Sequence, residues 1–471
     1  MGTARGRWVL LAAVLGSGIA LLDATVVNIA LPTLGRELDA DLTDLQWTVN
    51  AYVLALAALI LLGGSLGDRF GRRRVFVIGV VWFGVASLLC GLAPNIEALI
   101  AARALQGIGA ALLTPGSLAL LQASFVPGDR ARAVGAWSGL GGIAAAIGPF
   151  VGGLLVEVSW RLVFLINLPA CVAVVVLALR HVPESSDPQA SSRVDVAGAV
   201  LGALGLAGVT YALVAAGEQG ASAGVLASSL LGAAGLVGFV LVERRSTHPM
   251  MPLEVFSSRQ FSAANAVTFA VYAALGGVFF LLVVHLQVVA GFSPLAAGTS
   301  LLPITALMLA LSARAGALAA RTGPRLPMTV GPLLCAVGVL LMTRIDAGAD
   351  YVADVLPGVV LFGLGLSATV APLTVTVLAA APERYAGLAS GINNAVARTA
   401  GLLAVAVLPL AAGLKGTDDP AGFGRGFDRA LLLSAVLLAL GAAVSAVAIS
   451  DAGVRRPLQR ERHCALDAPP T

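Results

Sequence analysis

The chain has 471 residues, of which 58% are hydrophobic and only 11% are charged, and its mean hydropathy is +0.93. A soluble domain is about half apolar and about a quarter charged, so this composition excludes a soluble globular protein and indicates a polytopic membrane protein. The net charge of +4 is better explained by arginines in cytoplasmic loops than by a nucleic-acid surface. The four cysteines and four histidines are scattered without metal-ligand spacing, so we expect no metal site and no cofactor.

Fourteen segments are long and apolar enough to cross a bilayer, which takes about 20 helical residues. The first of them follows Arg5 and Arg7 and is not followed by a small-residue cleavage site, so we expect an uncleaved helix. The predicted helices occupy residues 8–31, 45–66, 75–93, 97–121, 134–156, 161–180, 195–216, 224–243, 263–288, 296–318, 326–343, 355–379, 387–411 and 428–449.

The distribution of basic residues predicts the orientation of these helices. If the N-terminus lies inside the cell, 21 basic residues fall in inside segments and six in outside segments. Cytoplasmic loops carry an excess of Lys and Arg, so this asymmetry predicts that both termini are cytoplasmic.

An internal repeat divides the chain. The segment Gly64–Arg73 matches Gly316–Arg325 at an offset of 252 residues, with Gly, Leu, Arg, Gly and Arg recurring in the same places. Parallel six-helix repeats with a site between them are typical of transporters. We therefore predict an all-helical membrane protein in a 6+2+6 arrangement: a six-helix half in residues 1–181, two inserted helices in 182–245, a second half in 246–450 and a cytoplasmic tail in 451–471.

Asp23 is a carboxylate deep inside an apolar run, where a charge costs about 2.5 to 3.5 kcal/mol on insertion scales. Arg103 is predicted to lie at a similar depth, about 9 Å from the outer end of its helix against about 12 Å for Asp23. A nearby Arg favours the ionised Asp whereas burial favours the neutral acid, so the two residues form a candidate proton switch. The alternatives are a static buried pair and direct contact of Arg103 with a substrate.

Four motifs in order resemble the major facilitator superfamily, and specifically its fourteen-helix drug:proton antiporters. The segment Gly64–Arg74 is similar to the hallmark loop of that superfamily, with Gly67 in place of the usual Ala. Leu22–Asn28 resembles the first-helix motif, Arg103–Ala111 the fourth-helix motif and Gly139–Gly153 the fifth-helix antiporter motif. The resemblance implies the major-facilitator fold and proton coupling through Asp23 and Arg103.

The hallmark loop and the fifth-helix motif are interpreted as conformational machinery. The resemblance implies that Asp68 locks one conformation through an arginine and a helix N-terminus, while the glycines and proline of the fifth helix suit a close, deformable contact. A topological anchor and ordinary helix packing remain the alternatives. The candidate gating residues are Gly64, Asp68, Arg69, Gly71, Arg72, Gly148, Pro149 and Gly152.

Polar and aromatic residues at membrane depth are candidates for a substrate cavity. Arg398 could hold an acidic substrate group, or it could equally cap a carbonyl group or support packing. Because the second half offers no matching carboxylate, we expect neutral, zwitterionic or monocationic substrates. The candidates are Asn28, Trp47, Gln106, Gln287, Asn394 and Arg398.

These patterns together predict proton-coupled efflux of amphipathic small molecules, such as drugs, dyes or a secreted natural product, across the cell membrane. The alternative within transport is a dedicated exporter of one cellular metabolite or lipid. A membrane-embedded enzyme is disfavoured, because there is no Ser/His/Asp set and no phosphate-binding loop. We expect the partners to be the substrate, protons and the bilayer, with the monomer as the functional unit.

Overall fold

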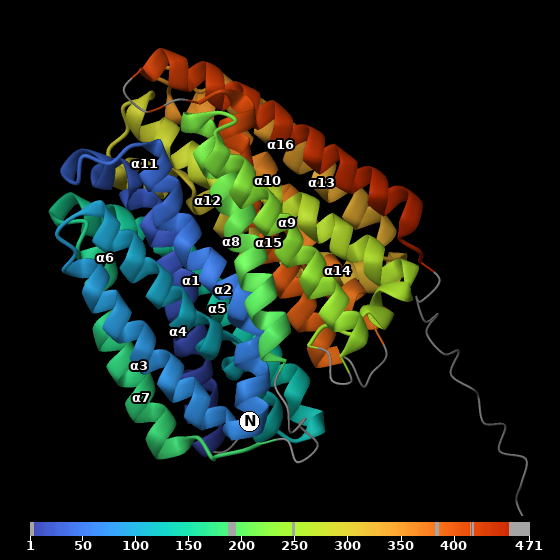
Figure 1. Ribbon diagram of the computed structural model, residues 1–471. Coiled ribbons are helices and arrows are strands. Elements are labelled where there is room, and N and C mark those ends of the chain that lie inside the picture. The colour runs from blue at the N-terminus through green and yellow to red at the C-terminus, as the bar shows by residue number, and fades with distance from the viewer. Residues whose placement is uncertain are drawn as a thin grey trace, which may run out of the picture.

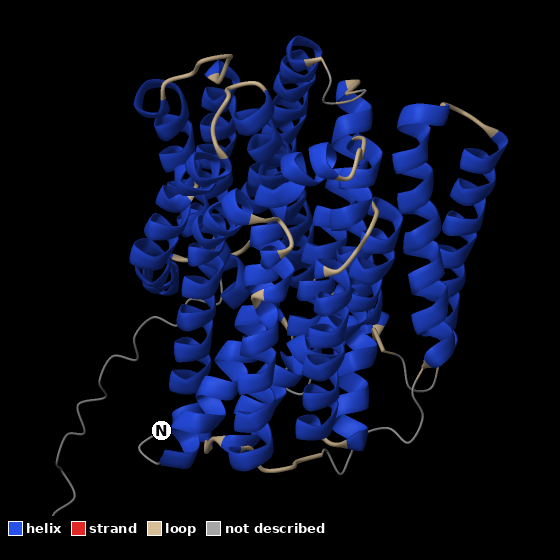
Figure 2. Ribbon diagram, turned by 90° about the vertical axis from the view of Figure 1, so that its left-hand side faces the viewer, coloured by secondary structure: helices blue, strands red, loops and turns tan. Residues whose placement is uncertain are grey.

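The computed structural model describes residues 4–186, 195–246, 250–381, 386–414, 416 and 419–451, and each element within these ranges is helical (Figures 1 and 2). Thirteen of the described helical segments are long and apolar enough to cross a membrane, and a shorter apolar helix covers Ile147–Val158. The predicted tail lies outside the described residues except for Asp451. The protein is therefore an all-helical bundle of membrane-spanning character.

The first group of helices packs within itself (Figure 1). Helix α4 contacts α2 and α3, α1 contacts α5, and α7 contacts α1 and α3. Glycines make this packing close: Gly63 of α2 lies against the backbone of Ala111 of α4, as small residues allow between membrane helices. The bounds are α1 (Ala4–Glu37), α2 (Leu42–Phe70), α3 (Arg72–Gly91), α4 (Ile96–Ser124), α5 (Pro127–Val158), α6 (Leu162–Leu165) and α7 (Asn167–His181).

A second group of helices packs in the same manner. Helix α14 contacts α12 and α13, α16 contacts α10 and α13, and α15 contacts α10. The bounds are η1 (Leu253–Ser257), α10 (Arg259–Val288), α11 (Pro294–Ser300), α12 (Leu302–Thr322), α13 (Arg325–Leu341), η2 (Met342–Arg344), η3 (Tyr351–Val355), α14 (Leu356–Ala380), α15 (Ala386–Ala412) and α16 (Pro420–Ala448).

Helices α8 (Val196–Gln219) and α9 (Ala223–Arg245) form a separate pair at the side of the bundle, at the right of Figure 2. They contact each other closely, and Gly208 of α8 meets Gly232 of α9 backbone to backbone. Helix α8 also contacts α2 of the first group and α15 of the second. The pair therefore lies across the seam between the two groups.

Proline positions explain two differences from the predicted helices. The segment predicted at 296–318 consists of α11 and α12, which meet at Leu301, and the segment predicted at 161–180 consists of α6 and α7, which meet at Ile166. In each case a proline stands in the first turn of the second helix, Pro303 in α12 and Pro169 in α7. The N–H groups of a first turn have no hydrogen-bond partner within their helix, so a proline there costs no helix hydrogen bond.

The two groups are joined most closely at one end of the bundle. We call the end that holds Arg69–Arg74 and Arg321–Arg325 the arginine-rich end, and the other the opposite end. At the opposite end, the side-chain amide of Gln46 donates to the Val405 carbonyl oxygen (2.6 Å) and that of Gln287 donates to the Ile29 carbonyl oxygen (3.1 Å). One hydrophobic core includes residues of both groups, whereas a second core lies mainly within the first group.

The segment Gly64–Arg74, predicted as a loop, is almost entirely helical. Helix α2 continues to Phe70 and α3 begins at Arg72, so only Gly71 separates them, with a φ of +105°. Gly323 follows α12 in the repeat with a φ of +95°. Residues other than glycine rarely adopt such φ angles, which is why glycine recurs at both corners.

Each glycine corner is closed by a carboxylate from beyond the last helix of its own group. The two Glu184 side-chain oxygens accept from the backbone N–H groups of Arg73 (3.0 Å) and Arg74 (3.2 Å), and Asp451 accepts from that of Arg325 (3.0 Å). A negative charge at a helix N-terminus is favourable because the unpaired N–H groups and the helix dipole point toward it. The internal repeat therefore extends to contacts that the sequence match did not include.

We expect Gly71→Ala to destabilise the protein by about 1–3 kcal/mol, because alanine must adopt a left-handed backbone and its Cβ would meet the Glu184 carboxylate. Gly67→Ala, four residues earlier in the last turn of α2, is the control: nothing lies within 4 Å of its added Cβ, and alanine favours the helix. Thermal unfolding of the purified proteins in detergent measures both changes. Equal stability of the two variants would contradict the role of the Gly71 corner.

Candidate functional site

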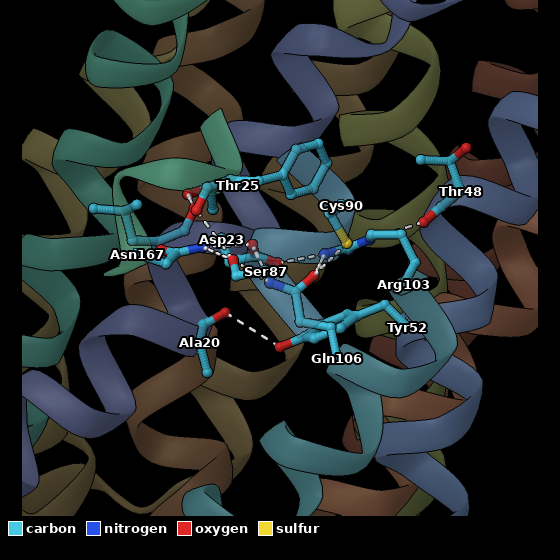
Figure 3. Close-up of polar contacts among 12 residues, drawn as sticks. Ala20, Asp23, Thr25, Thr48, Tyr52, Ser87, Cys90, Arg103, Gln106 and Asn167 are labelled. Carbon is cyan, nitrogen blue, oxygen red and sulfur yellow. Dashed lines mark hydrogen bonds and ion pairs between the residues drawn. The ribbon is translucent and has the colours of Figure 1, made fainter. Parts of the chain in front are cut away.

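Asp23 lies on α1 in the interior of the first group of helices and is fully buried (Figure 3). Its Oδ2 atom accepts a hydrogen bond from Nη1 of Arg103 on α4 at 2.5 Å. Its Oδ1 atom accepts from the side-chain amides of Gln106 on α4 (2.9 Å) and Asn167 on α7 (3.0 Å). Three helices therefore meet at one carboxylate, and every donor that surrounds it suits the ionised form.

Arg103 is buried to the same degree, with 1% of its surface exposed. Besides the ion pair, it donates from Nη1 to Oε1 of Gln106 (2.6 Å) and from Nε to the backbone carbonyl of Thr48 on α2 (3.1 Å). The Tyr52 ring covers the guanidinium, whose central carbon lies 4.3 Å from the ring centroid. The arginine thus connects Asp23 to α2, the helix that contacts the second group.

Ser87 of α3 holds the amide groups in place. Its hydroxyl accepts from Gln106 (3.0 Å) and Asn167 (2.9 Å) and donates to the Phe164 carbonyl oxygen (3.1 Å). A buried polar network that is fully bonded is rigid, whereas one unpaired member costs much of its desolvation free energy. The site therefore has one well-defined arrangement around ionised Asp23.

The hydrogen bonds around Asp23 set a condition for its protonation. A protonated Asp23 would itself need a hydrogen-bond acceptor, whereas Arg103, Gln106 and Asn167 all offer donors, so protonation would require one of these side chains to move. Within the described residues no cluster of three or more His, Cys, Asp or Glu side chains could hold a metal ion.

The candidate gating residues of α5 lie beside this site. Gly148 lies against the Thr25 side chain and Gly152 against Val26, so α5 is seated on α1 directly after Asp23. On the other side of α5, the Pro149 carbonyl group lies against Gly298 of α11. Helix α5 therefore links the turn that carries Asp23 to the second group of helices.

The candidate gating residues of α2 lie at the arginine-rich end. Asp68 pairs with Arg72 across the Gly71 corner, with a shortest distance of 2.7 Å, and both side chains are partly exposed. The Arg69 guanidinium lies over the Phe70 ring, and Gly64 lies near Pro115 of α4. The described contacts of Asp68 thus stay within the first group, and the carboxylate at the α3 N-terminus is that of Glu184.

The candidate cavity residues lie in different places. Gln106 is occupied by the Asp23 network, Trp47 contacts Tyr211 of α8 with ring centroids 6.2 Å apart, and Gln287 bonds α1. Asn28 keeps its side-chain oxygen buried without a hydrogen-bond partner. Asn394 and Arg398 are half-buried on α15.

Sequence reasoning missed Ser87, Asn167 and Tyr52 as members of the site. Each stands alone in an apolar run, and a lone Ser or Tyr there is common in packed membrane helices. The available signal was Asn167, an amide flanked by Ile166 and Leu168 at membrane depth, where a strongly polar side chain needs a hydrogen-bonding partner.

The sequence profile of the Major Facilitator Superfamily matches residues 13–405. The chain is 38% identical over 412 residues to the tetracenomycin C resistance and export protein of Streptomyces glaucescens, covering 86% of this chain and 76% of that protein. It is 36% identical over 416 residues to the multidrug resistance protein Stp of Mycobacterium tuberculosis H37Rv, covering 87% and 77%. It is 35% identical over 411 residues to the methylenomycin A resistance protein of Bacillus subtilis, covering 85% and 86%.

Solved structures share the fold at low sequence identity. A POT family transporter in complex with a thioalcohol-conjugated peptide has a TM-score of 0.71 at 14% identity, covering 94% of this chain and 96% of that one. A bacterial homologue of the human lysosomal transporter Spinster, in an inward-facing and unoccupied conformation, has a TM-score of 0.67 at 17% identity, covering 95% and 98%.

The buried pair predicts a specific pattern of stability. Arg103→Gln should lower the free energy of unfolding by about 3–5 kcal/mol, because it leaves the buried Asp23 charge without its cation. Asp23→Asn together with Arg103→Gln should recover most of that loss, since no unpaired charge remains. Thermal unfolding of the purified variants in detergent measures both effects.

Arg72→Gln is the control for this pattern, because its pair with Asp68 is partly exposed and should contribute about 1 kcal/mol or less. If Arg103→Gln were as mild as Arg72→Gln, the buried pair would not be the constraint that we describe.

Proposed function

Because the chain belongs to the Major Facilitator Superfamily, we propose that it is a proton-coupled exporter of amphipathic drugs or natural products. It is a multi-pass protein of the cell membrane, as its family and the thirteen apolar helices among its described residues indicate. The antibiotic-resistance and export proteins among its relatives support the outward direction of transport. The observation that carries the proposal is the fully buried Asp23–Arg103 pair at the meeting point of α1, α4 and α7.

The proposed layout is that of a fourteen-helix transporter in a 6+2+6 arrangement, with α5 as the fifth span. Residues 1–181 and 246–450 form the two halves and 182–245 carry the inserted pair α8 and α9. The packing of the helices into two groups with α8 across their seam supports this layout. The excess of arginine at the arginine-rich end supports its placement in the cytoplasm, with both termini on that side.

The proposed state of the transporter is closed toward the outside. The bonds between Gln46 and Val405 and between Gln287 and Ile29, together with the α5–α11 contact, hold the halves together at the opposite end. At the arginine-rich end, by contrast, Asp68 bonds within its own half and Gly67 has no close neighbour in the space that a Cβ would fill. If the halves separated at one end while they closed at the other, the Asp23 site would become accessible from the two sides of the membrane in turn.

Asp23 is the proposed proton carrier and Arg103 its counter-ion. Rearrangement of α5 against α1 would shift the turn that carries Asp23, because Gly148 and Gly152 seat the two helices directly on each other. A shift of that turn would loosen the hydrogen bonds from Arg103, Gln106 and Asn167 and allow the carboxylate to take up a proton. The proton and the conformation of the halves are thereby coupled through one helix contact.

The substrate is proposed to bind between the halves, near the unpaired side-chain oxygen of Asn28 and the exposed parts of Asn394 and Arg398. In this scheme Gln106 acts through Asp23, Gln287 closes the outer end, and Trp47 supports the contact with α8. Asp23, Arg103 and their partners all belong to one chain, which supports a functional monomer.

Efflux of rhodamine B from cells that express the chain tests the proposal. We expect the wild-type protein to lower dye accumulation, a protonophore to abolish this effect, and Asp23→Asn to reduce efflux to the level of cells without the protein. The reason is that Asn cannot carry the proton, although it preserves the size of the side chain.

Asp41→Asn is the control, because Asp41 is an exposed N-cap of α2 and Asn caps a helix equally well. The two variants must be compared at equal abundance in the membrane. Proton-dependent efflux by Asp23→Asn at the wild-type rate would refute the assignment of Asp23 as carrier.

A further inference from the structure

Arg398 is a second arginine at membrane depth, and its surroundings differ from those of Arg103. It stands 14 residues before the end of α15 at Ala412, and Asp23 likewise stands 14 residues before the end of α1 at Glu37. At 1.5 Å per residue both lie about 21 Å from the end of their helices. Within the part of the chain that the structure describes, Arg398 has no ion pair and no hydrogen bond.

The contacts of α15 show which way Arg398 faces. On one side of the helix, the Asn393 amide donates to Thr268 (2.7 Å) and Asn265 (3.2 Å) of α10. On the other side, Gly391 lies against Leu61 of α2. At 100° per residue, Arg398 falls between these two contact faces, on the arc from α10 to α2.

The helix that carries Arg398 joins the two halves: α15 contacts α2 of the first half and α10 of the second. Tyr52 of α2 covers Arg103 with its ring, and its hydroxyl donates to the Ala20 carbonyl oxygen (3.4 Å). Arg398 therefore lies on a helix at the meeting of the halves, next to the helix whose tyrosine covers the Asp23–Arg103 pair.

The charges around this point do not balance. Ionised Asp23 is neutralised by Arg103, which leaves the positive charge of Arg398 without a partner among the described residues. Arg161, in contrast, is half-buried near the opposite end and donates to the Gly91 (3.2 Å) and Ala93 (2.8 Å) carbonyl oxygens. An unneutralised guanidinium at membrane depth is costly, so it marks a position where a ligand can supply the missing charge.

We propose that Arg398 binds an acidic oxygen of the substrate, and that the molecules exported by this chain carry a carboxylate or an ionised phenol. The fork of N–H donors in a guanidinium matches the two oxygens of a carboxylate. This inference rests on the proposed export function. It narrows the neutral, zwitterionic or monocationic substrates expected from the sequence to molecules that bear an acid.

A matched pair of dyes separates the acid from the rest of the ligand. Rhodamine B carries a free carboxylate, and its methyl ester has the same fluorophore without that charge. Fluorescence anisotropy with the purified full-length protein in lipid nanodiscs gives the Kd of each dye. The wild-type protein should bind rhodamine B more tightly than the ester by about tenfold, which corresponds to one charge-assisted hydrogen bond of ordinary strength.

Arg398→Gln should weaken the binding of rhodamine B by about tenfold and leave the Kd of the ester within about twofold of the wild-type value. Arg344→Gln, an exposed arginine of η2 in the same half, is the control and should change neither Kd. If the Arg398→Gln protein still binds the ester, it is folded. A loss of the tighter binding of rhodamine B over the ester then shows that the contact between Arg398 and the carboxylate has been lost.

Two results would overturn the inference: a wild-type protein that binds the ester as tightly as rhodamine B, or an Arg398→Gln protein that keeps the full acid preference. Equal weakening of both dyes would also overturn it, because that pattern marks Arg398 as a packing residue. The export function is judged separately by cellular efflux. An acid preference that depends on Arg398 in a protein without proton-driven efflux would refute the proposed function and leave the binding site standing.

Discussion

The burial of one negative charge in an apolar bundle is the constraint on which the rest of this structure depends. Asp23 has no access to solvent, so its charge must be balanced and each of its oxygens must be hydrogen-bonded within the protein. Arg103 supplies the balancing charge, and Gln106 and Asn167 supply the remaining donors from α4 and α7. Because these donors come from different helices, the charge determines how those helices are placed around α1. In the proposed mechanism, a shift of α1 would alter these hydrogen bonds.

The contacts of α5 are made by small residues. Helix α5 lies on α1 through Gly148 and Gly152 and on α11 through the Pro149 carbonyl group and Gly298, so one helix contacts both the turn that follows Asp23 and the other half. Contacts of this kind have little side-chain interlocking to break when the helices slide. The electrostatics differ between the halves: in the part of the chain that the structure describes, Asp23 and Arg103 form a buried ion pair in the first half, whereas Arg398 of the second half has no ion pair. In the proposed scheme the proton and the substrate therefore have separate charged partners, Asp23 and Arg398.

The internal repeat is clearer in the hydrogen bonds at the two glycine corners than in the sequence identity between the halves. Gly71 and Gly323 turn the chain at the same place in the two halves, and Glu184 and Asp451 approach them from beyond the last helix of each half. Those carboxylates differ in length and stand in dissimilar surroundings in the sequence, so residue matching does not align them. What the repeat preserves is a physical requirement, namely acceptors for the unpaired N–H groups at the start of α3 and α13.

The membrane helices and the depth of the charges along them could be predicted from the sequence alone, because length and hydropathy determine which segments a bilayer accepts, and the family could be predicted from four ordered motifs. The similar depth of Asp23 and Arg103 could be estimated for that reason. The internal repeat located the glycines at both corners, but not their left-handed backbone. The direction of each side chain around its helix could not, since it depends on which helices are neighbours. Only the tertiary structure therefore showed that Gln106 belongs to the Asp23 network, that Trp47 contacts α8, and that Asn167 and Ser87 complete the site. It also showed that Arg398 has no ion pair and no hydrogen bond to any residue that the structure describes.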